Sequence, residues 1–234
     1  MSFSGPFALT SGIASGHYVQ WSRRLPSVTR KTQSSRSERR EEIRARLLAA
    51  VESLLADGES FTELPVERLV SLAGVSRSTF YVYFEDKGEL IQAWLTDISS
   101  RLEVAASQWW ALDAQSSWDD LRAALDRVVT VYRPQATLMA AAFDASAYDP
   151  GVREQVETMM ERNIAGLRKH IRTGQDAGTV DARIPAAQTA AWLTWMAERG
   201  LAQLVHGASE EEIAGLVDGY TWIVWNTLYA GAHP

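Results

Sequence analysis

The segment AGVSRSTFYVYFEDKGEL, residues 73–90, restricts the fold of this chain more than any other. It contains the signals for several helix ends within a short length. Gly74 can take the left-handed conformation that ends a short helix, and Ser76 can cap the next one. Asp86 can cap a third helix, with Glu89 in the capping-box position. The segment therefore predicts two short helices joined by a tight turn and followed at once by a longer helix.

The rest of the chain also has the apolar spacing of helices, and no run of residues has strand character. A first helix is expected from Ser37 to a stop at residues 56–58, and a two-turn helix from Pro65 to Leu72. After the opening segment, helices are expected near residues 87–111, 118–131, 134–146, 150–173, 186–206 and 210–230. The fold class that follows is all-α, with about nine helices.

The composition is that of a globular protein, with 46% apolar and 22% charged residues in a chain of 234. The chain has no Cys, which excludes disulfides and thiolate metal sites. It has no apolar run of about 18 residues and no export-type N-terminus, so we expect a cytoplasmic protein without a membrane span.

Sequence motifs for catalysis are missing. We find no Gly-rich phosphate loop, no nucleophile elbow and no helical metal-binding signature, and the four His are far apart in the sequence. The expectation is a protein that is not an enzyme and uses no metal or cofactor.

Polar side chains crowd the second short helix in a way that neither packing nor solvation requires. A merely solvated helix would favour Glu and Lys, whereas this one presents hydroxyl groups and an Arg. Such groups on the second helix of a helix-turn-helix can contact phosphates and base edges in the major groove of DNA. The donors are Ser76, Arg77, Ser78, Thr79, Tyr81 and Tyr83.

The wider segment FTELPVERLVSLAGVSRSTFYVYFEDKGELI, residues 61–91, resembles the DNA-binding signature of the tetracycline-repressor (TetR) family of bacterial transcriptional regulators. The resemblance implies homodimeric repressors with an N-terminal reading head and a C-terminal domain for ligand binding and dimerisation. Pro65 departs from the family pattern, which usually has Thr or Ser there. The DNA contacts that the resemblance implies are Arg77, Ser78, Thr79, Tyr81, Tyr83 and Lys87, with Arg44 and Thr62 as weaker candidates.

The domains expected on this basis are a helix-turn-helix domain at residues 35–90 and a helical ligand-binding and dimerisation domain at residues 91–234. Residues 1–34 read as a flexible basic arm, although an extension without any role fits equally well. The net charge of −6 is compatible with DNA binding, because residues 1–50 carry nine basic residues against three acidic ones.

The last two helices are almost free of charge, with only Glu198 and Arg199 between residues 186 and 204. Helices that are apolar nearly all round are buried on more than one face. We therefore expect a homodimer formed through these two helices. Glu198 and Arg199 can pair locally or across the dimer.

An effector cavity is expected in the C-terminal domain, where Trp and Met residues are frequent. These side chains can line a ligand site, but they can equally form a core. The C-terminal part also resembles the mycobacterial ethionamide-regulator branch of the family, which has two Asn where this chain has Thr194 and Ala197; this implies a less polar tunnel. The expected lining residues are Trp110, Leu125, Val129, Met139, Phe143, Met160, Thr194, Ala197, Leu201 and Trp225.

The sequence thus predicts a transcriptional repressor that a hydrophobic small molecule releases from a partly palindromic operator. One alternative is a DNA-binding regulator without an effector, whose cavity is filled by its own Trp side chains. A second alternative is an all-α carrier or enzyme in which the helix-turn-helix is incidental.

Overall fold

The structure, a computed structural model, describes residues 28–231, with side chains from Arg36 onward. Residues 1–27, most of the expected basic arm, lie outside the described residues. The described part is helical throughout and contains no strand, which confirms the all-α prediction. The helices are α1 (Val28–Ala56), α2 (Val66–Ala73), α3 (Arg77–Tyr83), α4 (Lys87–Trp110), α5 (Trp118–Tyr132), the short 3₁₀ helix η1 (Arg133–Gln135), α6 (Ala136–Ala145), α7 (Pro150–Ala177), α8 (Ala186–Leu204) and α9 (Glu210–Leu228).

Two helices, α1 and α7, extend beyond the bounds that the sequence predicts. Helix α1 begins at Val28, ahead of the expected Ser37, and no Pro or Gly interrupts the sequence up to Ala56. Helix α7 continues through Gly174, where a stop was expected, and ends at Gly178, which is left-handed with φ of 74°. A Cβ at Gly174 would lie 2.4 Å from the side chain of Val180, so this Gly serves close packing.

The helix-turn-helix forms as the sequence predicts. Gly74 ends α2 in the left-handed conformation, with φ of 61°. The guanidinium of Arg46 on α1 donates to the carbonyls of Ala73 and Gly74 at 2.7 and 2.6 Å, which satisfies free carbonyls at the end of α2. Phe80 and Phe84 are fully buried beneath α3. We call residues 39–84 the reading head.

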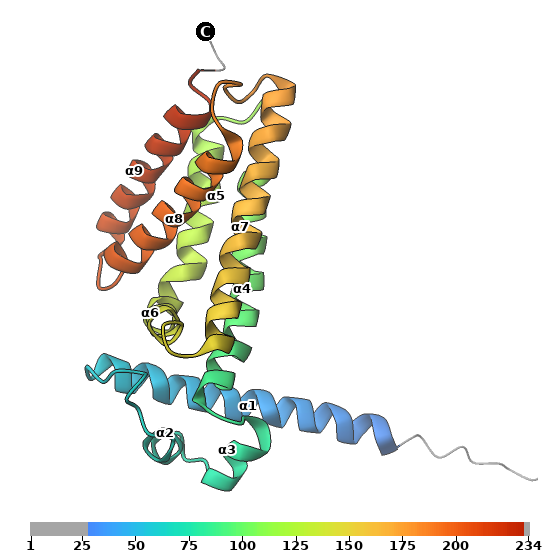
Figure 1. The fold of residues 1–234 in the computed structure, drawn as a ribbon, viewed down its shortest axis with the longest axis vertical. Coiled ribbons are helices and arrows are strands. Elements are labelled where there is room, and N and C mark those ends of the chain that lie inside the picture. The colour runs from blue at the N-terminus through green and yellow to red at the C-terminus, as the bar shows by residue number, and fades with distance from the viewer. Residues whose placement is uncertain (1–27, 232–234) are drawn as a thin grey trace, which may run out of the picture. The chain divides into compact units, whose positions relative to one another are not determined.

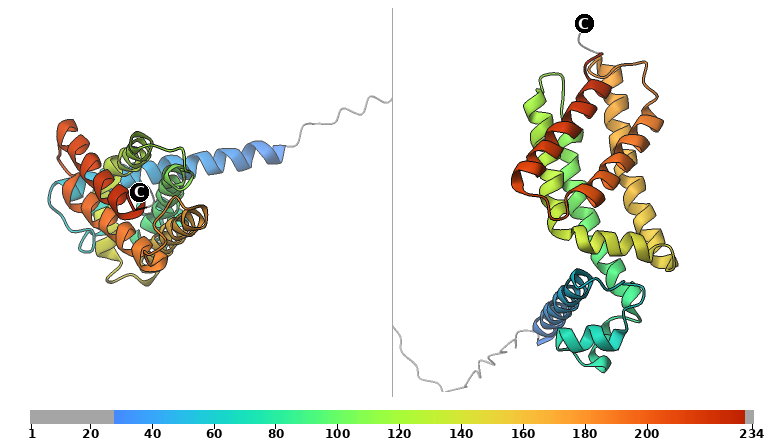
Figure 2. Two further views of the ribbon diagram at one scale, coloured as in Figure 1. Left: turned by 90° about the horizontal axis from the view of Figure 1, so that it is seen from above. Right: turned by 90° about the vertical axis from the view of Figure 1, so that its left-hand side faces the viewer.

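From Arg39 onward, the described residues form one compact unit that joins the reading head to a helical body. Within the body, α4 packs between α5 and α7, while α8 packs on α7 and α9 on α5 (Figure 1). Helices α8 and α9 contact each other only slightly. Figure 2 shows both on the same side of the body, diverging from one another.

The hydrophobic core has two clusters. The first runs from the reading head through the beginning of α4 to α6 and the start of α7. The second joins the end of α4 to α5, α7, α8 and α9. None of the helices in the described part is long and apolar enough to cross a membrane.

A buried hydrogen-bond network fixes the far end of the body. Trp109 Nε1 donates to the Tyr229 hydroxyl at 3.0 Å, and His170 Nε2 lies 2.8 Å from the same oxygen. His170 Nδ1 lies 3.0 Å from the carbonyl of Trp110, which can only accept, so Nδ1 carries the proton and Nε2 accepts from Tyr229. Burial lowers the pKa of His170, consistent with a neutral ring that joins α4, α7 and α9.

Candidate functional site

The exposed face of α3 is the first candidate site. Arg77, Ser78, Tyr81 and Val82 are exposed there, and their spacing places them on one side of the helix. Val82 was not among the predicted contacts, yet 74% of it is exposed. Its methyl groups could contact a thymine methyl. The sequence prediction selected hydrogen-bond donors and therefore did not include Val82.

The other predicted contacts on α3 are less free. Ser76 Oγ accepts from the backbone N–H of Thr79 at 3.0 Å, and lies 2.9 and 2.7 Å from the hydroxyls of Ser78 and Thr79. These hydroxyls therefore cap the helix as well as face outward. Tyr83 is half-buried against the core, whereas Thr62, in the turn before α2, is exposed.

Arg77 is held in place by two neighbours. Its guanidinium forms an ion pair with Glu67 of α2, and it lies 5.6 Å from the centre of the Tyr81 ring. All three side chains remain largely exposed. A DNA base or phosphate would have to take the place of Glu67 to bind Arg77.

Lys87, another predicted DNA contact, is bonded within the protein. Its Nζ donates to the carbonyls of Phe61, Thr62 and Leu64 at 2.7, 2.7 and 2.9 Å. These bonds use all three protons of the ammonium group, so none is left for a phosphate. Burial lowers the pKa of Lys87, and Asp86 partly opposes this. In the free protein Lys87 thus fastens α4 to the turn before α2, and the phosphate contact stays a prediction that requires at least one of these bonds to be exchanged.

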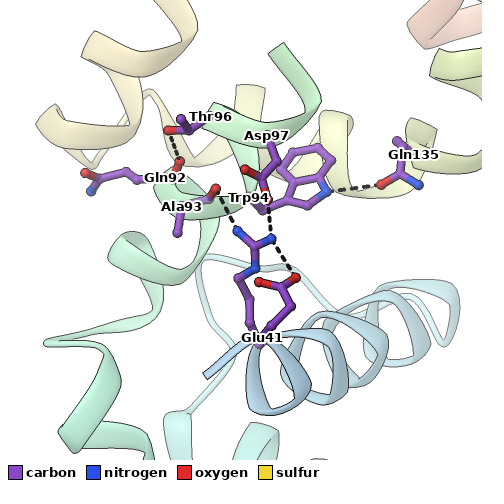
Figure 3. Close-up of polar contacts among 8 residues, drawn as sticks. Glu41, Gln92, Ala93, Trp94, Thr96, Asp97 and Gln135 are labelled. Atoms are coloured by element: carbon purple, nitrogen blue, oxygen red, sulfur yellow. Dashed lines mark hydrogen bonds and ion pairs between the residues drawn. The ribbon is translucent and has the colours of Figure 1, made fainter. Parts of the chain in front are cut away.

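Arg44 was also predicted to touch DNA, and the structure commits it to protein contacts. Its guanidinium pairs with Glu41 at 2.7 Å and with Asp97 of α4, and it donates to the carbonyl of Ala93 at 3.2 Å. Figure 3 shows these carboxylates and the Ala93 carbonyl converging between α1 and α4. In the free protein this side chain joins the reading head to α4, and the DNA contact of Arg44 stays a prediction that requires these contacts to be exchanged.

The beginning of α4 is fixed on its other side as well. Trp94 Nε1 donates to the side-chain oxygen of Gln135 in η1 at 3.1 Å (Figure 3). Gly88 lies so close to Asp149 that a Cβ would come within 2.0 Å of its carboxylate. A shift of α4 would therefore disturb several contacts at once.

The second candidate site is a cavity of about 400 Å³ within the helical body. Members of both hydrophobic clusters line it, so it interrupts the core. Helix α4 contributes Leu102, Ala106, Trp109 and Trp110. Eight of the ten residues expected to line an effector cavity lie in its wall: Trp110, Leu125, Val129, Met139, Met160, Thr194, Ala197 and Leu201.

The other two expected lining residues lie elsewhere. Phe143, one turn beyond Met139 near the end of α6, packs half-buried against the first cluster. Trp225 packs on Trp118 and Tyr229, with ring centres 6.0 and 5.3 Å apart. It lies five residues past Tyr220, about 140° around α9, and so faces away from the cavity. Both predicted placements are wrong.

Glycines create part of the cavity, and the sequence interpretation missed them. Gly200 of α8 and Gly215 and Gly219 of α9 line the cavity, and a Cβ at any of them would meet no atom within 4 Å. Gly within a helix costs about 1 kcal/mol relative to Ala, so the four-residue spacing of Gly215 and Gly219 was an available signal. On α7, Gly166 lets the Trp110 ring lie against the helix, since a Cβ would come 2.5 Å from it.

An apolar surface covers the outer sides of α8 and α9. Its large exposed side chains are Trp192, Trp195, Met196, Leu204, Trp222 and Ile223. Three of them, Met196, Leu204 and Ile223, also line the cavity, which therefore reaches this surface. Leu228, by contrast, is fully buried in the second cluster.

Comparison with protein families agrees with this arrangement. Residues 47–94 match the model described as bacterial regulatory proteins of the tetR family. Residues 121–230 match the C-terminal domain of the transcriptional regulator EthR. The first match covers most of the reading head, and the second covers α5 to α9. The chain belongs to the TetR family.

Curated relatives support this membership. The chain is similar to the HTH-type transcriptional regulator EthR of Mycolicibacterium smegmatis, with 26% identity over 216 residues, covering 88% of this chain and 97% of the relative. It is similar to EthR of Mycobacterium tuberculosis H37Rv, with 28% identity over 159 residues, covering 66% of this chain and 72% of the relative. These relatives are named as regulators of transcription, and this chain is a TetR-family, EthR-like transcriptional regulator.

Solved structures share the fold. The fatty acid degradation regulator FadR of Bacillus halodurans has a TM-score of 0.64 at 12% identity, covering 78% of this chain and 94% of that chain. FadR of Bacillus subtilis, solved in complex with stearoyl-CoA, has a TM-score of 0.62 at 12% identity, covering 81% and 99%. TetR-family regulators bind operator DNA, usually as dimers.

Proposed function

We propose that this TetR-family protein is a homodimeric repressor, and that a hydrophobic small molecule bound in the cavity releases it from a partly palindromic operator. The observation that carries the proposal is the course of α4. This helix forms part of the cavity wall, and only three residues separate it from the end of α3.

The exposed face of α3 is the DNA-reading surface in this proposal. Arg77 and Ser78 stand at the start of the helix, with Tyr81 and Val82 one turn later. In helix-turn-helix proteins the N-terminal residues of the second helix contact base edges. Arg77 can contact a guanine through two donors once Glu67 is displaced. Ser78 and Tyr81 can donate to phosphates.

The dimer forms through the apolar surface of α8 and α9. Trp192 and Trp222 are 75% and 62% exposed, which is unusual for side chains of this size. A twofold axis would place the same patch of two copies face to face and bury these rings. Two reading heads could then enter successive major grooves about 34–36 Å apart.

The effector site is the cavity between the two hydrophobic clusters. Its lining is almost entirely apolar and includes Met139, Met159 and Met160, which can repack around a ligand. The stearoyl-CoA complex of the Bacillus subtilis FadR supports the idea that this fold can hold a long hydrophobic ligand. The open volume argues against a cavity filled by Trp alone.

Coupling between the two sites would pass through α4. Lys87 fastens its first turn to the turn before α2, and Asp97 joins it to α1 through Arg44. A ligand that displaces the end of α4 near Trp110 would therefore move the reading head. A coupling of about 1–3 kcal/mol would give a useful response.

DNase footprinting of the full chain on the DNA upstream of its own gene, with and without 1-octanol, tests the proposal. We expect two protected half-sites about one helical turn apart and weaker protection with 1-octanol. Protection that 1-octanol leaves unchanged would favour a regulator without an effector. No protection even at low salt would favour a carrier, because phosphate contacts strengthen as salt is lowered.

A further inference from the structure

Glu198 of α8 is a buried carboxylate without a hydrogen-bond partner. Its side chain is only 6% exposed, and neither oxygen has a donor within hydrogen-bond distance. It lies in the cavity wall, where it is the one charged residue among the lining residues of the described chain. A buried, unpaired charge is strongly destabilising, so its presence in this wall requires an explanation.

Tyr132 at the end of α5 also lacks a hydrogen-bond partner. It is 2% exposed, lines the same cavity, and its hydroxyl has no partner. Burial raises its pKa, and the nearby Glu198 carboxylate raises it further. The cavity wall therefore contains two buried polar groups without hydrogen-bond partners, within a mostly apolar lining.

The protein itself does not supply the missing partner. Arg199 Nε lies 3.9 Å from the nearer Glu198 oxygen, too far for a hydrogen bond, and its side chain is 65% exposed. Glu198 is buried within a single chain, so its burial does not depend on a second subunit. The expected pairing of Glu198 and Arg199 is thus present only as a weak local contact.

We propose that Glu198 and Tyr132 form the polar end of the effector site, and that they select a lipophilic molecule with a protonated amine. This inference rests on the proposed function and specifies its ligand class. An ammonium group would neutralise the Glu198 carboxylate and donate hydrogen bonds to it and to the Tyr132 hydroxyl oxygen. The apolar part of the molecule would occupy the space beside Met139 and Leu201.

Three probes of equal chain length separate the contribution of the head group from that of the tail. Calorimetric titration of the full chain at pH 8 with octylamine, 1-octanol and octanoate compares a cation, a neutral group and an anion. An aliphatic amine has a pKa near that of Lys, about 10.4, and is therefore charged at this pH. We expect octylamine to bind about tenfold or more tighter than 1-octanol, and octanoate to bind least.

The variant Glu198→Gln keeps the shape of the side chain and removes the charge. It should lose the preference for octylamine, so that octylamine and 1-octanol bind with similar affinity. Glu154→Gln is the matched control, because it removes an exposed carboxylate of α7 and should preserve the preference. Tyr132→Phe should weaken octylamine about fivefold, for one lost hydrogen bond, and still favour octylamine over octanoate.

Equal binding of octylamine and 1-octanol by the wild-type protein, or a preference that persists in Glu198→Gln, would overturn the inference. In either case, release of operator DNA by 1-octanol would leave the proposed function intact. If octylamine binds selectively through Glu198 but leaves operator binding unchanged, the inference holds and the ligand-responsive function fails. If none of the three probes binds, both fail.

Discussion

Arg77, the first residue of α3, forms an ion pair with Glu67 of α2, and its guanidinium lies over the ring of Tyr81. The residue that the sequence singles out for base recognition is thus already held by an acidic partner in the free protein. Because both side chains of the pair are largely exposed, the pair itself adds little stability. Its consequence is that DNA must compete with Glu67 for Arg77.

The first prediction follows from this competition. Arg77→Ala should weaken operator binding by about 1–3 kcal/mol and relax discrimination at one base pair. Glu67→Gln should instead strengthen binding, because it frees Arg77 and removes a negative charge beside the DNA-reading surface. Fluorescence anisotropy on the operator and its single-base variants measures both effects. An equal loss on all sequences for Arg77→Ala would make Arg77 a phosphate contact.

A second prediction concerns the dimer surface and uses two leucines of opposite burial. Leu204 is 53% exposed on the apolar surface of α8 and α9, whereas Leu228 is fully buried within one chain. Leu204→Glu should shift the protein towards monomers and retain its helix content, because a carboxylate in the interface costs several kcal/mol. Leu228→Glu should instead destabilise the monomer itself, because it places a charge in the core of one chain.

Sedimentation velocity and circular dichroism together distinguish the two leucine variants. A Leu204→Glu protein that sediments as an unaltered dimer would place the subunit interface elsewhere. A Leu228→Glu protein with the thermal stability of the wild type would contradict the burial of that residue.

The third prediction tests the cavity without any ligand. Ala197→Trp adds bulk to the α8 wall of the cavity, opposite α4, and should imitate a bound effector. Operator affinity should fall about tenfold, at the level of a typical allosteric coupling, while the melting temperature stays close to that of the wild type. If Ala197 is plain core, overpacking should cost about 1–3 kcal/mol of stability with operator affinity intact. Thermal melting and operator titration of the same sample separate these outcomes.

The fourth prediction concerns the pH dependence of stability. Burial raises the pKa of Glu198 in the folded state, and the Arg199 guanidinium opposes this only in part; the other titratable group beside it is Tyr132. A raised folded pKa means that stability is present below the unfolded pKa and is lost as pH rises through the folded value. Glu198→Gln should therefore melt about 2–4 °C higher than the wild type at pH 8, for about 1 kcal/mol gained.

At pH 4, where the carboxyl group is largely protonated in both states, the same two proteins should melt at similar temperatures. A variant that is less stable than the wild type at pH 8 would show that Glu198 has a partner in the folded protein. Glu154→Gln controls for the loss of one negative charge and should show no such trend.

The helices could be predicted from the sequence because their signals are local. Ser76 caps α3 and Ser209 forms a capping box with Glu212, as their spacing indicates. The predicted box of Asp86 and Glu89 differs in one detail. The Asp86 side chain accepts from the N–H of Glu89, but the Glu89 side chain accepts from Glu85 rather than from Asp86.

The sequence did not reveal contacts between side chains and distant parts of the chain. Lys87 has the sequence position of a phosphate contact, but it lies beside three carbonyls of a turn more than twenty residues earlier. The same holds for Arg44, whose partner Asp97 lies fifty-three residues away in the sequence. Charge and position alone could not distinguish these internal contacts from DNA contacts.

The cavity could be predicted in outline and not in its polar detail. Helical spacing puts Thr194, Ala197 and Leu201 on one face of α8, and all three line the cavity as predicted. Helix α9 packs on α5 with one face and lines the cavity with another. Both faces are apolar, so the sequence did not show that Trp225 lies on the face away from the cavity. Glu198 resembled a surface charge in the sequence, and only its burial distinguishes it.

Thermodynamic linkage between the cavity and the operator tests the account most directly. Operator affinity should be titrated at increasing concentrations of whichever eight-carbon probe binds most tightly, and the affinity for that probe should be measured with and without operator DNA. The account predicts that a saturating probe weakens operator binding about 5- to 150-fold, and that operator DNA weakens probe binding by the same factor. Operator affinity that stays constant while the probe saturates the cavity would contradict it.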